Sequence, residues 1–210
     1  MIVSLNEIET MVHKAARGAG LPWGLAEEAA QAARWLARQG LPFETPLASL
    51  LASQAWRANL VLDGTHLRPR SDEAWLCPIR AGAWLSDLGD IVPVRIDRVL
   101  WPILLLPFAA RCACPVELAF AGVLLLTGAA TFAIRQGDLA ALRQPKALRV
   151  EVMAPASRDL EQARLLRPEG RVEVNMTGWS KLQSFEALTY VPASLESRLT
   201  GAGAAQSDND

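Results

Sequence analysis

The stretch that decides the fold spans residues 4–40 and reads SLNEIETMVHKAARGAGLPWGLAEEAAQAARWLARQG. Ser4 and Glu7 have the spacing of a capping box, in which each side chain bonds a backbone amide at the start of a helix. Pro22 suits the first turn of a second helix, because its missing N–H would have no partner there. These signals predict two consecutive helices.

Both helices carry an apolar stripe at three- and four-residue steps, which is typical of helices that bury one face. The stripes consist of Leu5, Ile8, Val12, Ala15 and Ala19 in the first helix, and of Leu25, Ala29, Ala32, Ala33 and Leu36 in the second. Gly18 and Gly20 are expected to end the first helix, since glycine readily adopts left-handed angles, and Gly40 the second. The many alanines let the two helices approach closely, so we expect an antiparallel helical hairpin.

Composition narrows the function classes. The chain has 210 residues with 21 basic and 22 acidic side chains, for a net charge of -1. Nucleic-acid binding requires a basic surface that neutralises phosphates, so we expect no nucleic-acid partner. Three cysteines, an odd number, fit a reducing compartment better than a disulfide framework, and the first residues lack the pattern of a secretory signal. We therefore expect a cytoplasmic protein.

One uncharged segment, residues 118–134, allows two interpretations. Its 17 residues reach the lower limit for a membrane-spanning helix. Buried strands are also continuously apolar, and Gly122 and Gly128 lie where turns or bulges would separate them. No basic cluster flanks the segment as it would in a membrane protein. We favour buried strands and expect no contact with a membrane.

The remaining elements are mostly strands. Thr45-Pro46 marks the start of a third helix, and residues 75–85 have the pattern of two short strands around a glycine turn. Residues 147–153 and 171–176 alternate between apolar and polar side chains, as half-buried strands do. Residues 157–166 have a short helical pattern.

The order of these elements predicts an α+β fold, with an N-terminal helical hairpin packed on a mainly antiparallel β-sheet. Residues 1–60 form the hairpin and third helix, residues 61–200 the sheet region with short helices, and residues 201–210 a flexible acidic tail. These parts could also form one continuous domain, since 210 residues suffice for a single large one.

Several stretches together resemble an uncharacterised bacterial family, a domain of unknown function. Besides the opening block they are Leu76 to Ala83, Leu104 to Phe108, Tyr190 to Ser194, Ser197 to Ala204 and Ser207 to Asp210. Ala205-Gln206 departs from the pattern, where another glycine is expected. The resemblance implies a soluble cytoplasmic protein of one family-wide architecture, and it implies no reaction, cofactor or catalytic residue.

Two familiar kinds of site have weak support. Cys77, Cys112 and Cys114 could form a metal or redox site with His66, but Cys112 and Cys114 are closer in sequence than the paired ligands of structural zinc sites. The sequence does not tell whether these cysteines converge. Glycines at positions 18–24 imitate a phosphate-binding loop, but such a loop follows a strand and here a helix precedes it. We expect no metal and no cofactor.

Charged residues offer the remaining candidates. Glu27 and Glu28 begin a helix, where its dipole favours negative charge, and Glu9 lies one helical turn before His13. Both pairs fit general acid–base chemistry, but ordinary surface pairs explain them equally well.

The most distinctive charges lie in apolar surroundings, at Arg80, Arg111 and Glu117. Such charges are costly unless paired, so these residues either pair with one another or line a pocket. Arginines in a pocket would suit a carboxylate or phosphate ligand. We favour structural pairing and keep the pocket as the candidate ligand-binding site.

Two functions follow from these residues. In the first, an accessory or binding protein holds a small anionic metabolite or a partner protein, and could self-associate. In the second, a metal-independent enzyme acts on a small molecule through carboxylates and arginines. A cleft that holds Arg80 and Arg111 beside Glu27, Glu28, Asp87 or Asp90 would favour the enzyme. Arginines buried in ion pairs beside an exposed apolar face would favour partner binding. No catalytic residue is assigned.

Overall fold

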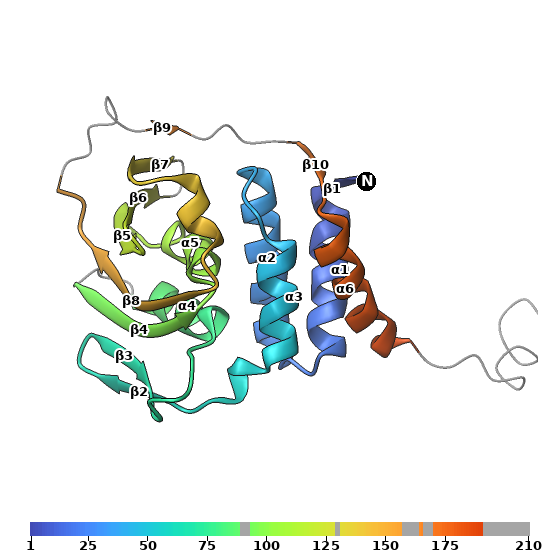
Figure 1. Ribbon diagram of the computed structural model, residues 1–210, viewed down its shortest axis with the longest axis horizontal. Helices are drawn as coiled ribbons and strands as arrows, with labels where there is room; N and C mark the ends of the chain where they lie inside the picture. The colour runs from blue at the N-terminus through green and yellow to red at the C-terminus, as the bar shows by residue number, and fades with distance from the viewer. Residues whose placement is uncertain (89–92, 129–130, 157–163, 166–169, 191–210) are drawn as a thin grey trace, which may run out of the picture.

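A computed structural model describes residues 1–88, 93–128, 131–156, 164–165 and 170–190 (Figure 1). The described residues form six α-helices, which are α1 (Leu5–Gly18), α2 (Trp23–Arg38), α3 (Glu44–Ser53), α4 (Pro78–Asp87), α5 (Leu106–Ala109) and α6 (Met176–Glu186). Short 3-10 helices are η1 (Ala55–Arg57), η2 (Pro102–Leu105), η3 (Leu139–Arg143) and η4 (Ala187–Thr189). The described residues therefore include the predicted hairpin and third helix.

The helical hairpin forms as the sequence predicts. Ser4 and Glu7 make the capping box at the start of α1. The alanines of both stripes are buried, apart from the partly buried Ala19. Gly20 has a φ of +92°, so it provides the expected left-handed turn. Gly18 has a different role, because a Cβ added there would lie 1.8 Å from the carbonyl oxygen of Phe185. The absence of a side chain at Gly18 lets α6 approach α1 closely.

The strands form two sheets within the described residues. Eight of them make one sheet in the order β2-β3-β4-β8-β5-β6-β7-β9, and β1 pairs with β10. Their bounds are β1 (Ile2–Ser4), β2 (Leu60–Asp63), β3 (His66–Pro69), β4 (Val94–Leu100), β5 (Val116–Phe120), β6 (Val123–Gly128), β7 (Thr131–Gln136), β8 (Lys146–Met153), β9 (Arg164–Leu165) and β10 (Arg171–Glu173). Neighbouring strands are antiparallel except for β3 and β4, so the predicted α+β class with a mainly antiparallel sheet is confirmed.

Short helices join the hairpin to the curved sheet. Figure 1 shows α4 and α5 inside the curve of the sheet, α2 and α3 beside them, and α1 and α6 on the far side. The hairpin also contacts the sheet directly, because the rings of Trp35 in α2 and Phe132 in β7 meet edge to face at 5.5 Å. One cluster of buried hydrophobic residues includes members of the helices and of the sheet. The boundary at residue 60 stays a prediction.

The apolar segment 118–134 forms strands, as we favoured. It contributes to β5, β6 and β7, and Gly122 lies in the turn between β5 and β6 with a φ of +80°. Among the described residues, no helix has both the length and the apolar character needed to cross a membrane.

Two local predictions are wrong. Residues 75–85 were expected to form two strands, but residues 78–87 form α4, which begins at Pro78 and buries Ile79, Ala81 and Leu85. Gly82 does not make a turn. It lies inside α4 where a Cβ would come within 2.3 Å of the Phe108 ring, so close packing explains it. The strand expected to reach Met176 ends at Glu173, because Asn175 caps the start of α6.

Other predictions fall largely outside the described residues. Of the helix expected over residues 157–166, only Arg164 and Leu165 are described, and they form β9. The tail at residues 201–210 and Asp90 lie outside the described ranges as well.

Candidate functional site

The structure does not bring Arg80, Arg111 and Glu117 together. Arg80, in α4, donates hydrogen bonds to the carbonyl oxygens of Trp56 and Ala58, both at 2.8 Å. These contacts fasten α4 to η1 and the residue after it. Arg80 is therefore used to hold the backbone between α3 and β2.

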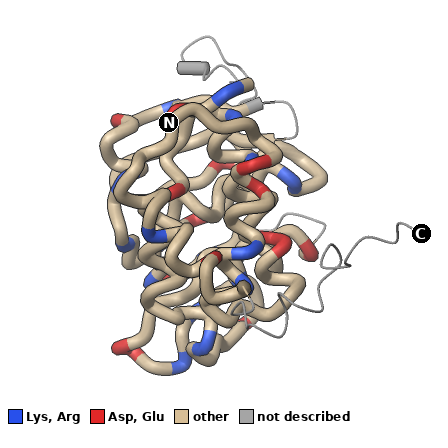
Figure 2. The backbone as a smooth tube through the Cα atoms, turned by 90° about the vertical axis from the view of Figure 1, so that its right-hand side faces the viewer, with Lys and Arg blue, Asp and Glu red and all other residues tan. Residues whose placement is uncertain are grey.

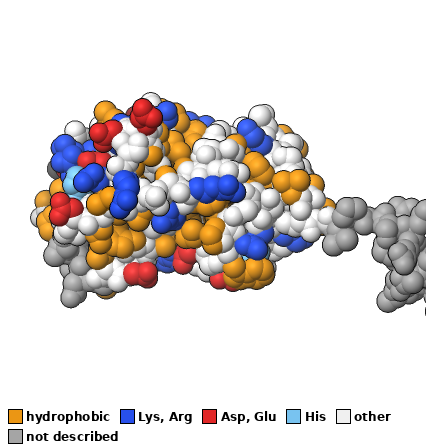
Figure 3. Space-filling view, turned by 90° about the horizontal axis from the view of Figure 1, so that it is seen from below, with side chains coloured by type: hydrophobic (Ala, Val, Ile, Leu, Met, Phe, Trp, Pro, Cys, Tyr) orange, Lys and Arg blue, Asp and Glu red, His pale blue; other side chains and the backbone are white. Residues whose placement is uncertain are grey.

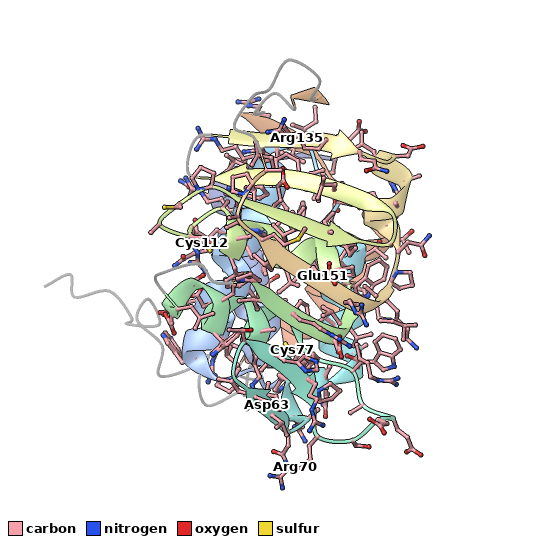
Figure 4. All side chains as sticks on the ribbon, turned by 90° about the vertical axis from the view of Figure 1, so that its left-hand side faces the viewer. Asp63, Arg70, Cys77, Cys112, Arg135 and Glu151 are labelled. Atoms are coloured by element: carbon pink, nitrogen blue, oxygen red, sulfur yellow. The ribbon has the colours of Figure 1, made fainter. Side chains whose placement is uncertain are left out.

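Glu117 is buried within the sheet. Its carboxylate lies 3.8 Å from Nε of Arg135, and only 8% of its side chain is exposed. The two residues belong to β5 and β7, the neighbours of β6 on either side. Figure 4 shows Arg135 at the β7 end of the sheet. This pair neutralises a buried carboxylate that would otherwise be costly.

Arg111 lies at the surface beside α2, directly after α5. It donates hydrogen bonds to the carboxylate of Glu28 and, at 3.0 Å, to the side-chain oxygen of Gln31. Its guanidinium carbon lies 4.7 Å from the centre of the Phe108 ring. Of the three residues predicted from sequence, Arg111 alone lines one of the hollows considered below.

That hollow lies between α2 and α5 and has a volume of about 230 Å³. We call it the arginine hollow, and its lining residues are Gln31, Ala32, Arg34, Trp35, Arg38, Pro107 and Arg111. Arg34 donates to Oε2 of Glu9 at 2.6 Å and to Oδ1 of Asn6 at 2.7 Å. Arg38 has no hydrogen-bond or ion-pair partner among the described residues.

Sequence reasoning missed the α2 side of this hollow. One face of α2 carries Gln31 together with the residues three, four and seven positions after it, which are Arg34, Trp35 and Arg38. The alanine stripe of α2 indicates only the buried face of this helix. A polar and aromatic stripe on the neighbouring face was the available signal, but it becomes a site only when α5 places Arg111 beside it.

A second hollow of about 390 Å³ adjoins the first. We call it the acidic hollow, and it is lined by Glu9, Thr10, His13, Glu27, Ala30 and Gln31. Gln31 lines both hollows. The acid–base candidates Glu9, His13 and Glu27 therefore do line one hollow. Within the described residues Glu9 and His13 do not bond each other: Glu9 accepts from Arg34, and the His13 ring contacts Trp23.

Trp23 stands beside the acidic hollow and is 60% exposed. Its Nε1 donates to Oε1 of Glu27 at 2.7 Å, and the His13 ring meets it edge on at 5.1 Å. The guanidinium carbon of Arg17 lies 5.2 Å from its ring centre. Nε2 of His13 is buried and has no hydrogen-bond partner among the described residues. Three neighbours thus hold an exposed indole in place.

A third group of charged side chains lies on the sheet and includes His66 and Asp97. Sequence reasoning did not connect these two residues. Nε2 of His66 is 2.8 Å from Oδ2 of Asp97, and Arg95 donates to both carboxylate oxygens, each at 2.8 Å. Burial raises the pKa of Asp97, but the hydrogen bonds and charges of Arg95 and His66 lower it below its usual value. The register of β3, β4 and β8 places these residues on adjacent strands, together with Glu151.

The cysteines lie in different surroundings. Burial raises the pKa of the Cys77 thiol to about 11 and also raises that of Cys112, whereas Cys114 is exposed. Figure 4 shows Cys77 and Cys112 well apart. Within the part of the chain that the structure describes, there is no group of three His, Cys, Asp or Glu side chains suited to a metal ion.

Part of the chain is similar to a known family model. Residues 3–78 match the model of a family described as a protein of unknown function (DUF3726), which confirms the resemblance to an uncharacterised family. This region includes α1, α2 and α3, and hence Arg34 and Arg38 but not Arg111. No curated protein matches the chain.

One solved structure is similar to this chain at a low level. It is the crystal structure of malate dehydrogenase from Entamoeba histolytica, at 10% sequence identity and a TM-score of 0.39. The alignment covers 75% of this chain and 50% of that enzyme, so the chain spans half of its length. At this score the likeness carries no argument about fold or activity.

Proposed function

We propose that this protein binds a small molecule with a carboxylate group, and that the arginine hollow holds that group. One observation carries the proposal: the side chains of Arg34, Arg38 and Arg111 line the same hollow, and Arg38 has no partner among the described residues. A guanidinium presents a planar set of donors that matches a carboxylate. Three of them around one hollow provide more donors than their described partners use.

The same hollow offers apolar surface for the rest of a ligand. Trp35 is half-buried and Pro107 is buried, and both line the hollow with Ala32. Small-molecule sites typically combine such apolar walls with a few polar groups that fix the orientation of the ligand. A carboxylate carried on a short hydrocarbon chain fits this combination better than a bare inorganic anion does.

The proposal can be tested with hexanoate, followed by NMR chemical-shift titration of the protein. Arg38→Gln removes the unpartnered charge and disturbs no described hydrogen bond, so we expect it to weaken binding by about fivefold. Arg70→Gln is the matched control, because Arg70 is also exposed and its side chain has no described partner. Figure 4 shows Arg70 at the far end of the β2–β3 region.

Comparison with the Arg70→Gln control separates a specific binding site from a general effect of charge. Equal weakening by both variants would mean that hexanoate responds only to net charge. Absence of saturable binding to the unmodified protein would reject the arginine hollow as a carboxylate site.

Partner binding is a second proposed function, favoured by exposed apolar side chains near the second half of α1. Trp23, Leu188 and Tyr190 are 60%, 68% and 59% exposed. Lys14 of α1 lies 5.7 Å from the Tyr190 ring centre, and Gly18 lies against η4. A protein partner or a second copy of the chain could bury these side chains. Size-exclusion chromatography with light scattering tests self-association, and a purely monomeric protein at high concentration would reject it.

Surface charge supports the absence of a nucleic-acid partner in this proposal. Figure 2 shows acidic and basic residues interspersed along the backbone, and Figure 3 shows side chains of both signs on the face that it displays. Such mixing provides no purely basic surface on the face in Figure 3. The cytoplasm remains the proposed location, and an enzymatic role for the carboxylates and arginines remains an alternative to simple binding.

A further inference from the structure

The arginine and acidic hollows form two ends of one charged surface along α2. Gln31 lines both, and the ion pair between Glu9 and Arg34 connects them, since Glu9 lines one hollow and Arg34 the other. Glu27 and Arg34 are seven residues apart, which separates their backbone positions by about 10 Å along the helix axis. The opposite charges therefore stand at different places along one helix.

The arginine hollow and the acidic hollow carry charges of opposite sign. Arg34, Arg38 and Arg111 line one hollow, whereas Glu9 and Glu27 line the other and Glu28 pairs with Arg111. A ligand that is only an anion would be attracted by the arginines, but any part of it that reached the acidic hollow would be repelled. A ligand with charges of both signs would be attracted at both ends.

The acidic hollow has acceptors that remain available. Glu27 uses one carboxylate oxygen to accept from Trp23, and its other oxygen has no hydrogen bond within the described part of the chain. Glu9 likewise uses only Oε2, for Arg34. The exposed ring of Trp23 stands next to Glu27, and its contact with the guanidinium of Arg17 is one in which an aromatic ring attracts a cation. Carboxylates beside an indole are suited to an ammonium group.

We infer that the ligand is an aminocarboxylate whose two charged groups are separated by a hydrocarbon chain. This inference rests on the proposed function, since the arginine hollow holds the carboxylate. The ammonium group then lies in the acidic hollow, where it donates to Glu27 and Glu9, and the chain between the charges passes Gln31. Binding needs no covalent step.

The test compares three ligands of equal chain length: hexanoate, adipate and aminohexanoate with its amine at the far end of the chain. We expect the unmodified protein to bind aminohexanoate about fivefold more tightly than the other two, the size of effect that one exposed ion pair provides. Glu27→Gln keeps an oxygen acceptor for Trp23 but removes the charge. It should reduce the preference for aminohexanoate, with Glu9 left as the remaining carboxylate of the acidic hollow.

Glu73→Gln is the matched control, because Glu73 is an exposed glutamate away from both hollows and its side chain has no described partner. It should retain the full preference. If aminohexanoate binds no more tightly than hexanoate and adipate, or if the preference is undiminished in Glu27→Gln, the inference is wrong while the carboxylate site stands. If none of the three ligands binds, the proposed function fails as well.

Discussion

The carboxylate of Glu28 accepts a hydrogen bond from the guanidinium of Arg111, 83 residues further along the chain. This contact places the residues after α5 against α2 and so completes the arginine hollow. It also means that Glu28 competes for the guanidinium with any anionic ligand. If the arginine hollow binds an anion as proposed, the same contact builds the site and limits its affinity.

Replacing Glu28 tests this competition. Glu28→Gln keeps an oxygen that can accept from Arg111 but removes the negative charge, so we expect hexanoate to bind about threefold more tightly. Stability should change by less than about 1 kcal/mol, because the Arg111 and Glu28 side chains are 37% and 31% exposed. The measurement is a hexanoate titration combined with urea unfolding. Weaker binding would show that Glu28 positions Arg111 rather than competing with the ligand.

Arg80 should affect stability alone. Arg80→Gln removes the guanidinium that serves the carbonyl oxygens of Trp56 and Ala58, so we expect the free energy of unfolding to fall by about 1–3 kcal/mol. The dissociation constant for hexanoate should stay the same, since Arg80 does not line the arginine hollow. Urea unfolding and titration of the same sample check both results. A loss of hexanoate affinity without a loss of stability would show that Arg80 belongs to the binding site.

The close approach of α6 to α1 predicts a steep cost for a single methyl group. In Gly18→Ala the new Cβ would clash with the carbonyl oxygen of Phe185, which is backbone and cannot rotate away, so we expect a loss of at least about 2 kcal/mol. Gly24→Ala is the control, because nothing lies within 4 Å of its added Cβ. It should be neutral or stabilising by about 0.5 kcal/mol. Thermal unfolding of both variants tests this difference in stability. Equal stabilities would refute the predicted packing of α6 against α1.

Acid stability should depend on Asp97. Arg95 and His66 lower the pKa of Asp97 in the folded protein below the ordinary 3.8, despite the opposing effect of burial. The ionised carboxylate thus stabilises the fold above pH 3.8, and this stabilisation is lost as the pH falls through the folded-state pKa.

Asp97→Asn removes that titrating group, so unfolding free energies measured from pH 5 downward should fall less steeply in the variant than in the unmodified protein. Parallel pH curves for the two proteins would show that Asp97 has the same pKa folded and unfolded.

The sequence was most informative where local signals agree. The capping box at Ser4, the two apolar stripes and the turn at Gly20 all indicate the same hairpin, and the structure contains it. The prediction of two short strands over residues 75–85 is wrong because Gly82, considered locally, suggests a turn, whereas it lies inside α4. Its small size instead serves packing against Phe108, a residue 26 positions away that no local pattern can place.

The site was less predictable for the same reason. Arg111 was singled out because its charge follows an apolar run, and it does line a hollow. Its partners Glu28 and Gln31 belong to a helix far away in the chain, so their roles depend on tertiary packing. Arg80 and Glu117 had similar sequence surroundings, but backbone carbonyls satisfy one and Arg135 neutralises the other.

The most direct test of the account is to locate bound hexanoate on the unmodified protein by NMR. The proposed carboxylate site predicts that the largest saturable shift changes involve the backbone amides of residues 31–38 in α2 and of residues 108–111, and that Arg38→Gln reduces them. Shift changes concentrated on β4 and β8, around Arg95 and Arg149, would contradict it and would move the binding site to the sheet.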